Sequence, residues 1–126
     1  MDMPVLDSGG VSRLAARSRQ MAALILALRE RDLWPPLVPS AALVECLQGH
    51  AGRDANAFLK TCDIAEDVPE SLARRAALLR RRAGRGSAID ALVVVVAEPE
   101  GTVLTGDVDD IAALAQCASR VRVERI

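Results

Sequence analysis

Three carboxylates of this 126-residue chain stand next to apolar segments, where they could take part in chemistry. Asp7 directly follows the apolar run 4–6. Asp107 comes shortly after a second run, 102–104, and Asp90 precedes the most apolar stretch of the chain. A carboxylate beside a buried segment costs free energy unless a cation or hydrogen bonds compensate for its charge. These acids are therefore the first candidates for a functional site.

Carboxylates that gather in one crevice favour a metal ion. At about 5 Å or less they repel one another strongly, so that either some take up protons or a cation binds among them. Oxygen ligands without a nearby histidine or cysteine select Mg²⁺ or Mn²⁺ over zinc. Such an ion lowers the pKa of a bound water and stabilises charge on a phosphate. The pattern predicts metal-dependent hydrolysis of phosphodiesters.

The expected metal ligands, direct or through water, are Asp7, Glu45, Asp90 and Asp107. We expect a hydroxyl of Ser8 or Thr105 to hydrogen-bond a metal-bound water. Taken singly, each acid has a structural explanation: Asp7 suits a turn, Glu45 a solvated helix face and Asp90 a helix cap. Their joint position, after strands and at the starts of helices, is what favours a metal site.

Composition indicates a single globular domain over residues 1–126, because 51% of the residues are hydrophobic and 26% are charged. The net charge of -1 gives no overall basic field for nucleic acid, although a local basic patch would suffice. Two aromatic residues are too few for a base-stacking platform. No apolar run approaches the roughly 20 residues that cross a bilayer, and no signal peptide is visible, so we expect a cytoplasmic protein without membrane contact.

The cysteines and the histidine suggest no chemistry of their own. Cys46, Cys62 and Cys117 are far apart and form no CxxC pair, so we interpret them as small core residues. His50 is the only histidine and follows a glycine in a polar turn. A mechanism that needs two histidines is therefore excluded.

The order of the predicted elements points to a parallel α/β sheet. We expect Ser8 and Ser40 to cap the first two helices. The predicted strands are 4–6, 37–38, 61–65, 102–104 and 120–124, and the predicted helices are 11–28, 41–47, 53–60, 70–82 and 107–117. In such sheets sites form beyond the carboxyl ends of strands. Asp7 and Asp107 would share one crevice if their strands are neighbours.

The segment 91–97 is ambiguous between helix and strand. Its run of valines favours a strand, which would form a hairpin with 102–104. The Ser87-x-x-Asp90 pattern resembles a capping box, and a length of about ten residues up to Pro99 suits a buried helix. We predict a helix.

Four segments resemble the acidic motifs of the PIN domain family: VLDSGG, SAALVECLQG, SAIDALVVVVA and VLTGDVDDIAALA. The resemblance covers essentially the whole chain. It is closest to the small single-domain PIN proteins that act as VapC-type toxins of toxin–antitoxin pairs. It implies a three-layer fold with a five-stranded parallel sheet in the order 3-2-1-4-5, and cleavage of RNA with Mg²⁺ or Mn²⁺.

By motif, the resemblance makes Asp7, Glu45, Asp90 and Asp107 the four acids, with Asp107 in a T-x-D pattern that begins at Thr105. Asp110 is implied as an accessory metal ligand, and Asp109 is a weaker candidate. The implied partners are a cognate antitoxin and a second copy of the chain. Gly106 departs from the family, in which a polar or basic residue is frequent between the threonine and the acid.

Arginines concentrate in one place, around the end of the helix predicted at 70–82. Arg81, Arg82 and Arg85 are candidates for contact with RNA phosphates near Asp90. A solvated helix end, favoured by the helix dipole, is the competing interpretation.

Two further classes of function stay open. A catalytically inactive PIN-fold binding protein would keep the fold without cleaving RNA. A phosphoacceptor receiver domain also gathers acids on a parallel sheet, but it needs a lysine at a strand end near them. Lys60 is the only lysine and precedes the weak third strand, so we consider the receiver domain the least favoured class.

Overall fold

A parallel sheet of five strands forms the centre of the computed structural model, which describes residues 2–126. The strand order is β3-β2-β1-β4-β5, as predicted. The strands are β1 (Pro4–Leu6), β2 (Leu37–Pro39), β3 (Asp63–Ala65), β4 (Thr102–Thr105) and β5 (Arg122–Arg125). The predicted α/β class and topology are therefore confirmed.

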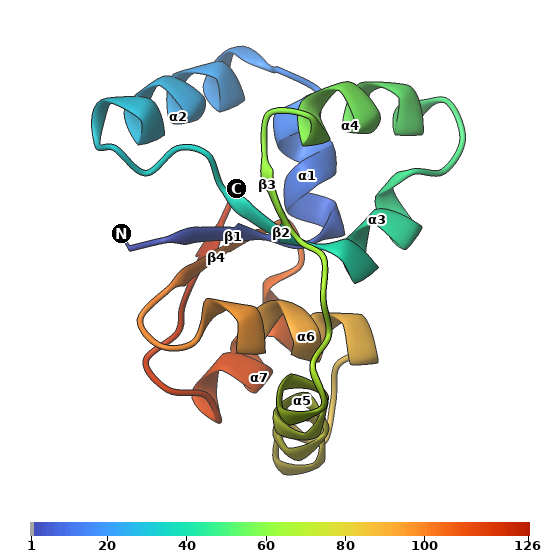
Figure 1. Cartoon of the computed structure of the whole chain (residues 1–126). Helices are drawn as coiled ribbons and strands as arrows, with labels where there is room; N and C mark the ends of the chain where they lie inside the picture. Colours follow the sequence, from blue (N-terminus) through green and yellow to red (C-terminus); the bar gives the residue numbers. More distant parts are fainter. Residues whose placement is uncertain (1) are drawn as a thin grey trace.

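Helices cover both faces of this sheet and make a three-layer structure (Figure 1). One layer contains α1 (Ser8–Ala15), α2 (Arg19–Glu30), α3 (Ser40–Cys46) and α4 (Ala51–Leu59). The other contains α5 (Glu70–Ala83), α6 (Ala88–Ala97) and α7 (Val108–Gln116). No helix within residues 2–126 combines the length and apolar character needed to cross a membrane.

Side chains of the central strands point alternately to the two faces of the sheet, and a hydrophobic core forms on each face. Val5 pairs with Val103, and both side chains pack into the core beneath α5, α6 and α7. Leu6 pairs with Leu104, and both pack into the core beneath α1 to α4. Because successive side chains of a strand point to opposite faces, this register buries both faces of β1 and β4.

The ambiguous valine segment is helix α6, as predicted. Ser87 Oγ accepts a hydrogen bond from Asp90 N at 3.0 Å, and Asp90 Oδ2 accepts one from Ser87 N at 3.0 Å. This is a complete capping box. Val93, Val94 and Val95 are buried, so packing outweighs the weak helix propensity of valine.

The single helix predicted over 11–28 is wrong, since the chain breaks into α1 and α2. Arg17 has a left-handed φ of 52°, which interrupts the helical path. Ser18 then caps α2 by accepting a hydrogen bond from Met21 N at 3.2 Å. The polar stretch that follows α1 therefore contains a new helix start.

Both predicted serine caps are also wrong. Asp7 is the N-cap of α1, and Ser8 is the first residue of that helix. At α3 the N-cap position is Pro39, without a side-chain cap. Ser40 Oγ instead donates a hydrogen bond to Glu66 O at 3.1 Å, which ties the start of α3 to the chain that leaves β3.

Candidate active site

Asp7 is the buried centre of the candidate site, with only 6% of its surface exposed. Its Oδ1 accepts a hydrogen bond from Gly10 N at 2.7 Å, which caps α1. Its Oδ2 accepts a hydrogen bond from the Thr105 hydroxyl at 2.5 Å. A side chain at position 10 would collide with Leu104 O, so glycine is what lets α1 start against β4. Asp7 is thereby fixed at the carboxyl ends of two neighbouring strands.

The pKa of Asp7 is raised from its ordinary value of 3.8, and burial is the main cause. The hydrogen bonds from Thr105 and Gly10 oppose this effect by stabilising the carboxylate. The negative charges of Asp90 and Asp107 raise the pKa further. The structure therefore brings Asp7, Asp90 and Asp107 into one electrostatic group.

Asp107 offers the most accessible carboxylate of the three. It is the N-cap residue of α7, but its side chain makes no capping hydrogen bond, and the residue is exposed. Its backbone N–H donates to Thr105 Oγ1 at 3.0 Å, so the same threonine holds both acids. Asp90 is half-buried, and one of its oxygens is used in the capping box of α6.

Glu45 and Asp110 are not among the charges that act on Asp7. Glu45 is exposed on α3. Asp110 forms an ion pair with Arg85, whose Nε lies 2.7 Å from Asp110 Oδ1. Ser8 is half-buried in the first turn of α1, next to Asp7.

The donors of the acidic group suit a hard cation in type and charge. Its three side chains offer only oxygen ligands, and the described hydrogen bonds leave the Asp107 carboxylate unused. A cation would also relieve the repulsion that raises the pKa of Asp7. Across residues 2–126, however, no three His, Cys, Asp or Glu side chains are grouped tightly enough to hold a metal ion.

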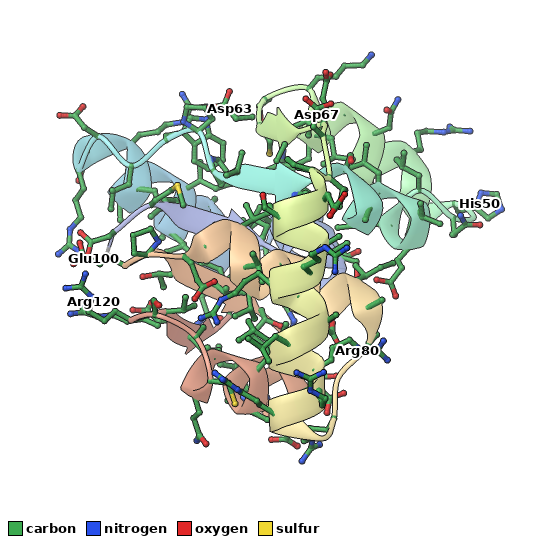
Figure 2. The ribbon with its side chains drawn as sticks, turned by 60° about the horizontal axis from the view of Figure 1, so that its bottom comes forward. His50, Asp63, Asp67, Arg80, Glu100 and Arg120 are labelled. Atoms are coloured by element: carbon green, nitrogen blue, oxygen red, sulfur yellow. The ribbon has the colours of Figure 1, made fainter. Side chains whose placement is uncertain are left out.

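A hollow of about 530 Å³ lies beside the end of α5, and arginines line it. The residues that form it are Ala77, Arg80, Arg81, Gly84, Arg85 and Gly86. Arg80, visible on α5 in Figure 2, donates from Nε to Gly86 O at 3.2 Å and so holds the loop that leads to α6. Arg82 does not line this hollow. Two of the three arginines predicted to contact RNA, Arg81 and Arg85, thus share one concave surface.

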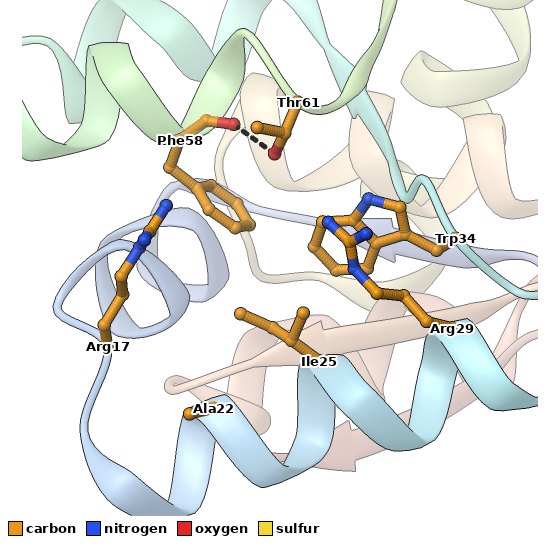
Figure 3. Close-up of a pocket in the computed structure, with 7 residues that line it drawn as sticks. All are labelled: Arg17, Ala22, Ile25, Arg29, Trp34, Phe58 and Thr61. Carbon is orange, nitrogen blue, oxygen red and sulfur yellow. Dashed lines mark hydrogen bonds between the residues drawn. The ribbon is translucent and has the colours of Figure 1, made fainter.

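A second hollow, of about 210 Å³, lies between α2 and α4 and was not predicted from the sequence. Figure 3 shows Trp34 and Phe58, the only aromatic residues of the chain, facing it together. Their rings meet edge to face, with centroids 6.0 Å apart, and the Arg29 guanidinium lies 5.0 Å from the Trp34 ring. Arg17 lies on the rim. Composition showed that aromatics are scarce but could not show that the two meet.

The three cysteines pack at buried or half-buried positions, and the histidine is exposed. Cys46 is buried, Cys62 and Cys117 are half-buried, and all three are free thiols. Burial raises the pKa of the Cys62 thiol to about 11, so this thiol is protonated at neutral pH. His50 is exposed at the start of α4 and projects from the edge of the molecule (Figure 2).

No protein-family model matches this chain, and no match is found among curated proteins.

Proposed function

We propose that this protein is a Mg²⁺- or Mn²⁺-dependent endoribonuclease with a PIN-type site. One observation carries the proposal: Asp7 is buried at the carboxyl end of β1, bound by Thr105 at the end of β4, and close enough to Asp90 and Asp107 for their charges to raise its pKa. Acids gathered at the carboxyl end of a parallel sheet are suited to bind a ligand there.

In this proposal Asp7, Asp90 and Asp107 hold the metal ion. When bound, the ion supplies an activated water and offsets the charge on the scissile phosphate. Thr105 keeps the Asp7 carboxylate oriented through its hydrogen bond. Burial of Asp7 keeps bulk water from solvating it and so strengthens its interaction with a cation. Glu45 and Asp110 belong to the proposal through the motif resemblance, with less support from their positions.

The arginine-lined hollow supports RNA as the substrate. Arg85 carries a raised pKa, first because of its bond to Asp110 and also because the charges of Asp109 and Asp107 act on it. Its guanidinium therefore lies near the acidic group. Arg80 and Arg81, on α5, line the same hollow. Phosphates of a single strand that crosses this hollow would pass beside Asp107.

The test is cleavage of single-stranded RNA by the purified chain with Mg²⁺ or Mn²⁺. Asp7→Asn and Asp107→Asn should each abolish cleavage, because each removes one charge from the acidic group. Asp54→Asn is the matched control, since it removes an exposed acid from the first turn of α4 and should retain activity. Equal cleavage by all four proteins would point to a contaminating nuclease and refute the proposal.

The alternative function is a PIN-fold interaction protein without catalysis. The use of one Asp90 oxygen in the capping box of α6 favours it. If the wild type cleaves no RNA with either metal yet binds a protein partner, this alternative replaces the nuclease.

We further propose that the nuclease is the toxin of a type II toxin–antitoxin pair. It would bind a cognate antitoxin and form a homodimer. The hollow between α2 and α4 supports a protein partner, because an apolar floor there is flanked by Arg17 and Arg29. Leu26 on α2 is 58% exposed and Val44 on α3 is 68% exposed, which leaves apolar surface for a second chain. A short adjacent reading frame for a DNA-binding antitoxin, and the molecular mass in solution, test these two assemblies.

A further inference from the structure

Arg13 lies directly over the loop that joins β4 to α7. A Cβ atom on Gly106 would come within 2.7 Å of Arg13 Nε and 3.4 Å of Arg13 Cζ. Gly106 stands between Thr105 and Asp107, two residues of the candidate active site. The side chain of Arg13 therefore occupies the space that a side chain at position 106 would need.

The guanidinium of Arg13 is free to bind a ligand. Arg13 is exposed in the last turn of α1, and none of the ion pairs formed by residues 2–126 includes it. The packing of α1 comes from its other face, where Val11 and Leu14 are fully buried. As a structural residue, Arg13 contributes a favourable interaction with the C-terminal end of the helix dipole.

We propose that Arg13 binds the RNA phosphate that faces Asp7 and Asp107, and that Gly106 leaves the room for it. This inference rests on the proposed nuclease function. A phosphate beside several carboxylates needs a local positive charge, and a guanidinium offers planar N–H donors that match phosphate oxygens two at a time. Arg13 brings such a group from α1 to the loop between Thr105 and Asp107.

The first test measures binding of a short, end-labelled single-stranded RNA by fluorescence anisotropy in EDTA, where metal-dependent cleavage does not occur. Arg13→Gln should weaken binding about fivefold and flatten the dependence of log affinity on log salt concentration by about 0.7, the value for one single-strand phosphate contact. Arg19→Gln is the matched control, because it removes an exposed arginine from the start of α2. Equal losses for both variants would overturn the inference, since they would report only net charge.

The second test displaces Arg13 without changing it. In Gly106→Ala the new methyl group would meet the flexible end of Arg13, so we expect the arginine to move and the backbone to stay. The variant should weaken RNA binding about threefold, and adding it to Arg13→Gln should cause no further loss, because the two changes act on one interaction. Additive losses would mean that Gly106 acts independently of Arg13 and would contradict the inference. Thermal unfolding of each variant checks that it is folded.

Cleavage by the wild type, measured separately with Mn²⁺, distinguishes the two proposals. A wild type that cleaves RNA while Arg13→Gln binds RNA normally would refute the role of Arg13 and leave the nuclease intact. A wild type that never cleaves RNA but shows binding that depends on Arg13 would refute the nuclease and leave Arg13 as an RNA-binding residue.

Discussion

The hydroxyl of Thr105 donates a hydrogen bond to Asp7 Oδ2 at 2.5 Å, although the two residues are 98 positions apart in the sequence. β1 and β4 are adjacent and parallel, so their carboxyl ends meet at one edge of the sheet. The same hydroxyl accepts a hydrogen bond from Asp107 N at 3.0 Å. One threonine thus connects the ends of two strands and two acids of the candidate active site.

Thr105 should matter far more to stability than Thr102, its counterpart at the other end of β4. Both are fully buried, but the Thr102 hydroxyl has no hydrogen-bond partner. Thr105→Val leaves Asp7 Oδ2 and Asp107 N without their hydrogen-bond partner and should lower the free energy of unfolding by about 1–3 kcal/mol. Thr102→Val removes an unsatisfied hydroxyl and should leave stability unchanged or raise it by about 1 kcal/mol. Urea unfolding measures both; similar losses would show that the bond to Asp7 is not important.

Asp7→Asn should stabilise the protein at neutral pH. The folded state raises the pKa of Asp7 above 3.8. Between pH 3.8 and the pKa of the folded state, the folded chain therefore binds more protons than the unfolded chain. Stability of the wild type therefore falls as the pH rises from about 3.8 through the folded pKa, and asparagine avoids this loss. The difference in melting temperature between Asp7→Asn and the wild type should grow with rising pH and disappear in acid. A constant difference across the pH range would contradict the assigned cause.

A divalent ion should reverse the order of stability, so that at neutral pH the wild type becomes more stable than Asp7→Asn. If Asp7 helps to hold Mn²⁺, the ion stabilises the wild type by mass action and has less effect on Asp7→Asn. Melting curves at neutral pH with and without Mn²⁺ measure this, and Asp54→Asn should respond as the wild type does. Equal shifts for the wild type and Asp7→Asn would argue against Asp7 as a ligand.

The contribution of Glu98 to stability should depend on pH in the opposite sense to that of Asp7. Its carboxylate, 13% exposed, accepts hydrogen bonds from Arg75 Nε at 3.0 Å, Arg75 Nη2 at 2.8 Å and Ser119 N at 2.7 Å. These contacts tie the end of α6 to α5 and to the turn before β5. The hydrogen bond from Arg75 is the main reason why the pKa of Glu98 is lowered from 4.5.

Glu98→Gln should therefore cost about 1.5–3 kcal/mol of stability at neutral pH, the order expected for hydrogen bonds to a charged group. The contribution of a carboxylate with a lowered pKa is complete above its unfolded pKa and is lost as the pH falls through its folded pKa. The stability gap between the wild type and Glu98→Gln should accordingly shrink below about pH 4.5. Denaturant unfolding across this range checks the sign, and a gap that persists in strong acid would contradict it.

The parallel α/β class was predictable from the sequence because short apolar runs that alternate with helices are local signals. The strand order was expected only from the motif resemblance, and the registers Val5 to Val103 and Leu6 to Leu104 were not predicted. The helix at 88–97 was predictable because Ser87 and Asp90 form a cap that outweighs the valines. The break at Arg17 was missed because polar residues at the end of an apolar face are equally compatible with a continuous helix.

The sequence indicated which acids were candidates for the site, but it did not indicate how their side chains and their neighbours are arranged. The position of Asp7 and Asp107 after neighbouring strands was enough to bring them together. The ion pair of Asp110 with Arg85 and the contact of Arg13 with Gly106 depend on side-chain directions across elements far apart in sequence, which periodicity does not specify. The contact between the rings of Trp34 and Phe58 could not be predicted for the same reason.

Ser87 and Asp90 together allow the helix cap to be separated from the proposed metal site. Ser87→Ala removes the acceptor for Asp90 N and should destabilise the protein by about 1 kcal/mol, while the Asp90 carboxylate and RNA cleavage are retained. Asp90→Asn keeps an oxygen that can accept from Ser87 N but removes the charge that acts on Asp7, so stability should change little and cleavage should be lost. Thermal unfolding and RNA cleavage, measured on both variants, give the two readouts. If Asp90→Asn loses stability as Ser87→Ala does and still cleaves RNA, Asp90 is a capping residue only, and the acidic group reduces to Asp7 and Asp107.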